Sequence, residues 1–303
     1  MRQIDGAPLW PDQVPHLLHR MAPARVFIVP YRDRAAQREV LLERLNCYLA
    51  DDRDWDVYFV HQCDDRPFNR GAMKNIGFMA IKAWYPEHYQ DITFIFHDVD
   101  TWPSWKGQFP YTTVPGVVAH YYGARFALGG VVAIKGSDFE RSGGFANFWG
   151  WGLEDNVLQD RCLQAGLRID RRVFYPLLDS TVHRAFDGFR RRASPREASV
   201  YKFGRPDGLR DLRAVRWRTG AGGMIHVGHF LTPTLHNAQE YSAIDIRSGT
   251  RLRANKNLLK HDPRLTRAPL VRRARSAPAH LTHRGRKKIK APLGGIIRRW
   301  PPR

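Results

Sequence analysis

The sequence lacks the features that would place the protein in a membrane or outside the cell. It has no run of eighteen apolar residues, roughly the length that a membrane-spanning helix needs. Its start, MRQIDGAPLWPDQVPHLLHR, has neither the basic region nor the apolar region of a signal peptide. We therefore expect a soluble, cytoplasmic protein with no transmembrane segment.

Cysteine is also scarce. The three cysteines, Cys47, Cys63 and Cys162, are odd in number and match no common spacing of a disulfide framework or a metal site. We expect them to be reduced residues of the core. An apolar content of 43% and nine Trp in 303 residues are enough for one sizeable α/β domain plus a tail, or for two small domains.

Acidic residues are almost missing from the C-terminal part of the chain. Residues 246–303 hold 18 Lys and Arg and a single acid, Asp262, whereas the rest of the chain holds 31 basic and 28 acidic residues. This C-terminal segment is also rich in proline and has little periodicity. We expect an N-terminal extension over residues 1–23, a folded domain over 24–245 and a disordered basic tail over 246–303.

The basic tail predicts an anionic partner. Near an anionic membrane surface each basic residue contributes up to about 1 kcal/mol, so the tail could hold the protein on a bilayer without a transmembrane helix. Nucleic acid would be attracted by the same charge. A nucleic-acid-binding protein is therefore one alternative function, which we favour less because the net charge of +20 belongs to the tail and the body is nearly neutral.

The body of the chain alternates between predicted strands and predicted helices. The pattern strand, helix, strand, helix, strand predicts an α/β fold with a parallel sheet and right-handed crossovers. A late strand is expected at 224–230. The other strands are expected at 25–29, 55–61, 94–96, 117–122 and 128–134, the last interrupted by Gly129 and Gly130, and the helices at 35–52, 72–85 and 154–167.

Two acids follow the predicted strand at residues 94–96. Asp98 and Asp100 should lie on one side and Val99 on the other. Ligands of open α/β sheets bind outside the carboxyl ends of strands, and a cation would stabilise two neighbouring carboxylates. Hard oxygen ligands suit Mg²⁺ or Mn²⁺. A simple turn, with Pro103 close behind, is the alternative interpretation.

Basic and aromatic residues mark two further loops. Arg32 and Arg34 precede the first predicted helix, where planar guanidinium groups would suit a diphosphate, although a solvated charged loop is the alternative. Trp149 and Trp151 stand among glycines before two acids. We expect a mobile aromatic surface beside these acids, which is an arrangement that commonly holds sugar rings, while acids at a helix N-terminus also complement the helix dipole.

Four blocks of the sequence resemble the beta-1,4-galactosyltransferase family. They are PYRDR at 30–34, FNRGAMKNIGF at 68–78, FIFHDVD at 94–100 and GGVVAIKGSDFERSGGFANFWGWGLEDN at 129–156. The HDVD and LEDN forms are most similar to its xylosylprotein branch. Over about residues 24–245 the resemblance implies a GT-A fold and an inverting transferase that uses Mn²⁺ or Mg²⁺. The implied reaction moves galactose or N-acetylgalactosamine from a UDP-sugar to a hydroxyl of a glycan acceptor, with beta linkage.

The resemblance also implies roles for individual residues. Asp155 would be the catalytic base, and Asp100 and His183 would bind the metal. The acceptor site would include Trp151, Gly152, Glu154 and Asp155. The nucleotide-sugar site would include Pro30, Tyr31, Arg32, Arg34, Phe68, Arg70, Asp98, Val99, Gly130 and Trp151.

The metal-binding histidine remains open at this point. The family has such a histidine downstream of its Trp motif, in some branches as a His-x-His pair. His183 is the best match, but Ala185 stands where the companion would be. His226 and His229 are the runners-up, although their segment reads as a late strand.

The donor sugar and the activity itself also have alternatives. Galactose-selective members of the family carry Tyr two residues before the glycine pair, where this chain has Ala127. We therefore expect UDP-N-acetylgalactosamine to be used beside UDP-galactose. A catalytically inactive sugar-binding protein of the same fold is an alternative, but the presence of both Asp100 and Asp155 argues against it.

Overall fold

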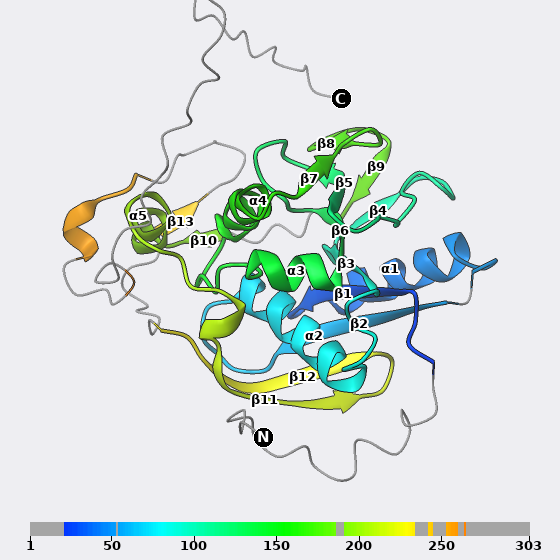
Figure 1. Ribbon diagram of the computed structural model, residues 1–303, viewed down its shortest axis with the longest axis horizontal. Coiled ribbons are helices and arrows are strands. Elements are labelled where there is room, and N and C mark those ends of the chain that lie inside the picture. The colour runs from blue at the N-terminus through cyan, green and yellow to red at the C-terminus, as the bar shows by residue number, and fades with distance from the viewer. Residues whose placement is uncertain are drawn as a thin grey trace, which may run out of the picture. The chain divides into compact units, whose positions relative to one another are not determined.

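The computed structural model describes residues 21–52, 54–185, 191–233, 242–244, 253–259 and Arg264 (Figure 1). The chain divides into two units, Met1–Pro269 and Leu270–Arg303. The second unit lies outside the described residues, as do residues 1–20 of the predicted N-terminal extension. No helix within the described ranges is long and apolar enough to cross a membrane.

A nine-stranded mixed sheet forms the centre of the fold. Its central strands β1 (Arg25–Tyr31), β2 (Trp55–Gln62) and β3 (Thr93–His97) run parallel, with β1 in the middle. The carboxyl ends of these three strands therefore meet at one edge. The other strands are β12 (Met224–Leu231), parallel to β2, β11 (Arg213–Gly220), antiparallel to β12, β6 (Val131–Lys135), antiparallel to β3, β5 (Val117–Gly123), antiparallel to β6, and β7 (Arg168–Asp170) and β8 (Tyr175–Pro176), both parallel to β5.

Helices cover both faces of the sheet, because the central strands are apolar on both sides (Figure 1). Val26 and Ile28 of β1 pack toward α2 (Arg70–Trp84), α3 (Gly136–Ser142) and α4 (Glu154–Gln164). Phe27 and Val29, which point the other way, pack against α1 (Ala35–Tyr48). The predicted order of strands and helices is confirmed, including the late strand.

Two short ribbons and a helix complete the described fold. β4 (Thr101–Pro103) pairs with β9 (Val182–Arg184), and β10 (Arg191–Ala193) pairs with β13 (Ser242–Ile244), both antiparallel. The helix α5 (Pro195–Phe203) begins after Ser194, whose hydroxyl accepts from Glu197 N. Two short 3₁₀ helices, η2 and η4, span Leu209–Asp211 and Lys256–Leu259.

Some described residues beyond 245 pack against α5. Leu259 is buried beside Val200, and Arg264 Nη1 lies 2.6 Å from Glu197 Oε2 in a buried ion pair. These contacts lie C-terminal to the predicted domain end. The domain boundary near residue 245 and the disorder of the tail stay predictions, since most of the tail lies outside the described residues.

Two details of the sequence prediction were wrong. Gly129 and Gly130 precede β6 instead of interrupting a strand, because Gly130 has a φ of 76° that ends the extended conformation. Cys162 is buried as expected, but Cys47 and Cys63 are exposed. The exposure of a cysteine depends on its position in the helix or strand. Cys47 lies on a face of α1 that points away from the core, and Cys63 follows the last residue of β2.

His120 of β5 is a buried neutral histidine. Its Nε2 lies 3.0 Å from the carbonyl oxygens of both Tyr122 and Gly129, and its Nδ1 accepts from Arg171 Nε at 3.0 Å. Burial, followed by the nearby Arg171 cation, lowers the pKa of His120 to about 4. Protonation would remove the acceptor that Arg171 uses.

We expect His120 to make the protein less stable in acid. In the unfolded chain histidine binds a proton below its ordinary pKa of about 6.5, but folded His120 does not do so until about pH 4. The free energy of unfolding should therefore fall by about 1.4 kcal/mol per pH unit for this group between those values. Urea unfolding at several pH values measures how steeply the free energy of unfolding falls with decreasing pH. This dependence on pH should be weaker in His120→Gln, and an equal dependence in both proteins would contradict the assignment.

Candidate functional site

Arg70 lies at the centre of a buried charged cluster at the carboxyl edge of β1, β2 and β3. It is the first residue of α2, whose N-cap, Asn69, accepts a hydrogen bond from Ala72 N through its side chain. Gly71 brings this helix end close to the next segment, because a Cβ there would lie 1.9 Å from Ala146 O. The turn into α2 therefore fixes where the Arg70 guanidinium points.

Three carboxylates surround the Arg70 guanidinium. Its Nη2 donates to Asp98 Oδ1 at 2.7 Å, its Nη1 lies 3.4 Å from Glu154 Oε1, and its Nη2 lies 3.9 Å from Asp155 Oδ2. Burial alone would lower the pKa of Arg70, but Asp98 and the other acids raise it above its ordinary value. Burial would raise the pKa of Asp98, but Arg70, together with Lys74 and other nearby cations, lowers it below its ordinary value.

Asp155 is held by a second cation. Lys74 Nζ donates to Asp155 Oδ1 at 2.9 Å, and the ammonium also lies 4.3 Å from the centre of the Phe145 ring. Lys74 follows Arg70 by four residues, so both side chains project from one face of α2. That spacing was visible in the sequence, but Lys74 was not predicted as a site residue.

Glu154 has an unsatisfied oxygen in this cluster. Its side chain is 2% exposed, and Oε1 accepts no hydrogen bond from the described residues despite its proximity to Arg70. Burial, followed by the negative charge of Asp155, raises the pKa of Glu154. A group that donates a hydrogen bond would stabilise this carboxylate.

Asp100 is the acid whose negative charge is least compensated by nearby cations. Its backbone oxygen accepts from Ala185 N at 2.8 Å, and its Oδ1 accepts from the Thr101 hydroxyl at 3.3 Å. Among the described residues the closest cation is Arg191, with Nη2 4.0 Å from Asp100 Oδ2. Burial, and next the charge of Asp98, raise the pKa of Asp100. A nearly buried carboxylate beside a second acid fits a hard divalent cation.

His183 lies on the ribbon that continues from Asp100. β4 and β9 pair Trp102 with His183, and Ala185 N bonds to Asp100 O two residues further along each strand. In this register Asp100 and His183 belong to the same side of the ribbon. The exposed His183 ring stacks on Trp102, with centroids 6.2 Å apart and an interplanar angle of 21°.

The runners-up, His226 and His229, lie on a different part of the sheet. They belong to β12, and the strand order β12-β2-β1-β3 separates β12 from the strand that leads to Asp100. Three steps between strands amount to about 14 Å. Neither histidine could therefore share an ion with Asp100.

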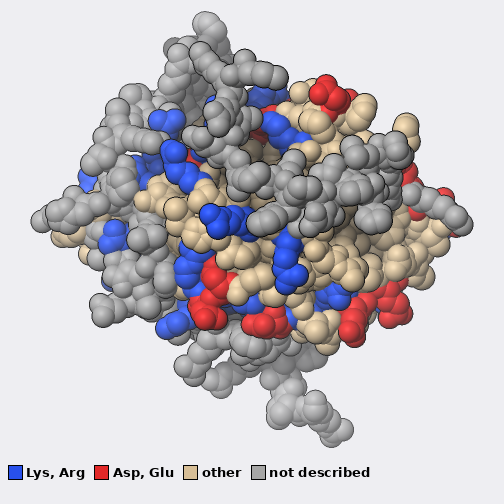
Figure 2. Space-filling view, turned by 90° about the horizontal axis from the view of Figure 1, so that it is seen from below, with Lys and Arg blue, Asp and Glu red and all other residues tan. Residues whose placement is uncertain are grey.

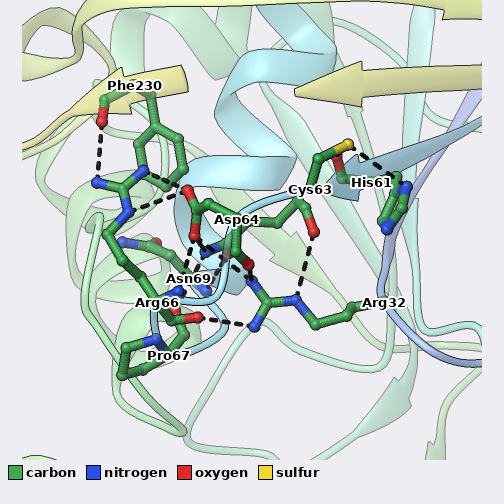
Figure 3. A network of polar contacts seen from close by, with 9 residues as sticks. Arg32, His61, Cys63, Asp64, Arg66, Pro67, Asn69 and Phe230 are labelled. Atoms are coloured by element: carbon green, nitrogen blue, oxygen red, sulfur yellow. Dashed lines mark hydrogen bonds and ion pairs between the residues drawn. The ribbon is translucent and has the colours of Figure 1, made fainter. Parts of the chain in front are cut away.

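Arg32 braces the loop between β2 and α2 (Figure 3). It donates to the backbone oxygens of Gln62, Asp64 and Arg66 at 3.3, 2.8 and 2.7 Å. Its guanidinium also lies 5.4 Å from the centre of the Phe68 ring. Arg32 therefore positions the loop that carries Phe68, a role that the sequence did not predict, and these bonds occupy donors that were expected to bind a diphosphate.

The two tryptophans of the glycine-rich stretch have different environments. Trp149 is buried, stacks on Phe230 and donates from Nε1 to Thr232 Oγ1 at 3.0 Å, so its predicted place on an aromatic surface was wrong. Trp151 is half-buried, and its backbone N donates to Arg192 O at 2.7 Å. Gly152, with a φ of 99°, then leads into α4.

The remaining predicted donor residues lie at the same edge of the sheet. Asp98 N donates to Gly130 O at 3.0 Å, which joins the acid to the loop before β6. Val99 packs into the core. Pro30 and Tyr31 end β1, and Arg34 immediately precedes α1.

Two family models match the chain. One, described as the N-terminal region of glycosyl transferase group 7, matches residues 18–108, and the other, described as the N-terminal domain of galactosyltransferase, matches residues 116–183. The chain belongs to the beta-1,4-galactosyltransferase family. Both models together cover more than half of its 303 residues, and they include the predicted residues from Pro30 to His183.

Members of the beta-1,4-galactosyltransferase family are similar to this chain over about half of its length. Human beta-1,4-galactosyltransferase 4 is 34% identical over 154 residues, covering 48% of this chain and 44% of the human protein. Mouse beta-1,4-galactosyltransferase 7 is 28% identical over 163 residues, covering 50% and 46%. The chain thus matches less than half the length of these relatives.

Solved structures of the same family share the fold. A Drosophila beta-1,4-galactosyltransferase 7 mutant, in complex with manganese, UDP-Gal and xylobiose, has a TM-score of 0.53 at 18% identity, covering 69% of this chain and 93% of that chain. The catalytic domain of the Drosophila protein with xylobiose has a TM-score of 0.51 over the same shares. The predicted GT-A fold is confirmed.

We expect Gly129→Ala to destabilise the protein through Asp155. A Cβ at position 129 would lie 2.3 Å from Asp155 Oδ2 and 2.7 Å from its Cγ, so the carboxylate would have to move away from Lys74. Overpacking of this kind costs about 1–3 kcal/mol of the free energy of unfolding, which urea denaturation measures. Gly228→Ala is the control, because nothing lies within 4 Å of a Cβ there. Equal stability of the two variants would argue against the close packing of Gly129 on Asp155.

Proposed function

We propose that this protein is a metal-dependent inverting glycosyltransferase that moves galactose or N-acetylgalactosamine from a UDP-sugar to a hydroxyl of a glycan acceptor. The observation that carries the proposal is that Asp98, Glu154 and Asp155 all surround Arg70, while Asp100 follows Asp98 by two residues. This cluster lies at the sheet edge where α/β proteins bind ligands. Membership of the family and the GT-A fold support it.

Asp100 would hold the divalent ion, and His183 would complete its protein ligands. The donor set fits, since a nearly buried carboxylate and an exposed histidine stand on one side of the β4–β9 ribbon. The Drosophila relative was solved with manganese and UDP-Gal, which favours Mn²⁺ and a UDP-sugar here as well. When bound, such an ion neutralises the negative charge that develops on the departing UDP.

The donor nucleotide would lie against the loop that Arg32 fixes. Phe68 and Arg70 stand at the end of this loop, and Arg32 holds its backbone through three carbonyl groups. Because the loop is already fixed before the donor binds, little ordering is needed on binding. Tyr31, at the end of β1, borders the same region.

Asp155 would act as the general base toward the acceptor. The acceptor hydroxyl forms the new bond to the anomeric carbon while the bond from that carbon to the UDP oxygen breaks, and the hydroxyl proton passes to Asp155. General-base assistance of this kind contributes about 10²- to 10⁴-fold in rate. Lys74 and Arg70 fix the orientation of Asp155. Glu154 Oε1, which accepts no hydrogen bond from the described residues, would accept one from a second acceptor hydroxyl. Trp151 and Gly152 lie just before these acids, and Trp151 would contact an apolar sugar face.

Substitutions at the two central acids should separate binding from chemistry. Asp155→Asn should keep Mn²⁺-dependent UDP binding, because Asp100 is intact, and lose transfer by at least about 10²-fold. Asp100→Asn should lose the metal dependence of both UDP binding and transfer. Calorimetry with UDP and Mn²⁺, paired with a transfer assay on UDP-galactose, measures both effects.

Each outcome has a clear meaning. Full transfer by Asp155→Asn would move the base to another group, with Glu154 next in line. Full activity of Asp100→Asn in excess chelator would exclude a metal on Asp100. If the unsubstituted protein binds a UDP-sugar yet transfers no sugar to any of a panel of glycan acceptors, it is an inactive sugar-binding protein.

Donor choice should depend on Ala127. This residue is 7% exposed in the loop before Gly129 and Gly130. Its side chain is smaller than the Tyr that galactose-selective members of the family carry there, so the N-acetyl group of a donor sugar would have more space. We expect comparable use of UDP-galactose and UDP-N-acetylgalactosamine. Ala127→Tyr should shift the ratio of kcat/KM values toward UDP-galactose, by about 10-fold or more for the loss of such space. An unchanged ratio would contradict the space argument.

A partner for the basic segment 246–303 is proposed from its charge alone. Most of that segment lies outside the described residues. On the described part of the face in Figure 2, Lys and Arg are interspersed with Asp and Glu, and no extended patch of one sign is seen there. We propose an anionic membrane surface as the partner of this segment, with nucleic acid as the less favoured alternative, and a cytoplasmic location for the protein.

A further inference from the structure

Two histidines and a cysteine meet at the carboxyl end of β2, outside the cluster around Arg70. β12 runs parallel to β2 with His226 directly opposite His61, and Cys63 N donates to Val227 O at 3.0 Å just beyond the strand end. Residues 61 and 63 share a side of the chain because side chains alternate. The pairing therefore brings all three side chains together, although His61 and His226 are 165 positions apart in the sequence.

The three donor atoms already have the spacing of metal ligands. His61 Nδ1 and His226 Nδ1 are 3.2 Å apart, and Cys63 Sγ lies 3.6 Å from the first and 3.9 Å from the second. A tetrahedral Zn²⁺ with bonds of about 2.0–2.1 Å to nitrogen and about 2.3 Å to sulfur places two nitrogens about 3.3 Å apart and nitrogen about 3.6 Å from sulfur. All three observed separations lie within a few tenths of an ångström of these values.

The surroundings favour a soft ion over a hard one. Two imidazoles and a thiol match zinc or another borderline ion, whereas Mn²⁺ and Mg²⁺ prefer oxygen. Arg218 stands opposite His226 on β11, so the cluster has a cationic neighbour. A thiolate ligand reduces the net charge of a bound divalent ion to +1, which lowers its repulsion from Arg218. Cys63 is exposed, so an ion can reach the donors from solvent.

A hydrogen bond between the two imidazoles is the simpler explanation, and it accounts for only part of the geometry. It uses His61 and His226 alone, and although the Cys63 thiol also lies 3.5 Å from His61 O, that contact does not account for its approach to the His226 ring. The same nitrogen of each ring faces the other ring and the sulfur. All three donors point at one common space, which a single ion would fill.

We propose that His61 Nδ1, Cys63 Sγ and His226 Nδ1 bind one Zn²⁺-class ion, with water as the fourth ligand. Binding deprotonates the Cys63 thiol, and the proton goes to solvent. The ion joins β12 to the end of β2 and so fixes the start of the loop that Arg32 braces, because Cys63 is followed directly by Asp64 (Figure 3). This site is separate from the one proposed on Asp100, and it does not depend on the proposed transferase activity.

Cobalt binding to the full-length, metal-stripped protein tests the site directly. Co²⁺ bound to a thiolate in tetrahedral geometry gives a sulfur-to-metal charge-transfer band and intense visible bands, and one equivalent of Zn²⁺ should abolish both. Cys63→Ser should lose the charge-transfer band, and His226→Ala should weaken Zn²⁺ binding. Since even outer-sphere partners change metal affinity by about 10- to 100-fold, loss of a direct ligand should cost at least about 10-fold.

The chain offers matched controls. Cys47→Ser removes another exposed cysteine, and His229→Ala removes another exposed histidine of β12. Both variants should keep the spectrum and the Zn²⁺ affinity of the unsubstituted protein. Bands that survive in Cys63→Ser, or an equal loss of affinity in His226→Ala and His229→Ala, would overturn the proposal.

Alkylation of the unsubstituted protein covers the case in which a variant fails to fold. Iodoacetamide labelling followed by mass spectrometry reports Cys63 and Cys47 in one sample. Stoichiometric Zn²⁺ should slow the labelling of Cys63, because a metal-bound thiolate is protected from alkylation, and leave that of Cys47 unchanged. Equal labelling of Cys63 with and without Zn²⁺ would show that the cluster binds no ion.

Discussion

The ion pairs of Arg70 are the interaction on which the rest of the site depends. Asp98 follows β3, whereas Glu154 and Asp155 begin α4, and these three acids could not be buried together without a cation between them. Removal of one partner from a buried ion pair typically costs about 3–5 kcal/mol, since the remaining charges stay uncompensated. Arg70 therefore joins the end of β3 to the start of α4.

Glycines make this charge cluster possible. Gly71 lets the first turn of α2 approach Ala146 O, and Gly129 leaves the space in which the Asp155 carboxylate turns toward Lys74. Gly130, with its positive φ, then accepts from Asp98 N through its carbonyl. Four segments thus meet within hydrogen-bonding distance of one another. The motifs that resemble the family contain these glycines and buried acids. Close backbone approach and buried charge both restrict which residue types can occupy such positions.

Prediction from the sequence succeeded where the signal was local. Apolar runs located the central strands, and the blocks around Arg70, Asp100 and Asp155 contain the acids that the fold brings to one edge of the sheet. It failed where a side chain's environment depends on a distant partner. Trp149 is buried because Phe230, far along the chain, stacks on it, and Cys63 meets His226 only because β12 pairs with β2. No spacing within a single segment could have revealed these contacts, whereas the position of Lys74 four residues after Arg70 could have been used.

The two candidate metal sites at this edge of the sheet offer different kinds of donor atom. Beyond β3, Asp98 and Asp100 offer oxygen, and burial together with mutual repulsion raises the pKa of Asp100 until a positive charge compensates it. Arg184, Arg70 and Arg191 supply part of that compensation, and Arg191 lies 4.0 Å from Asp100. Beyond β2, the donors are nitrogen and sulfur. Because β1 and β2 lie between Asp100 and His226, an oxygen-seeking ion and a sulfur-seeking ion can occupy the two places without competing for a ligand.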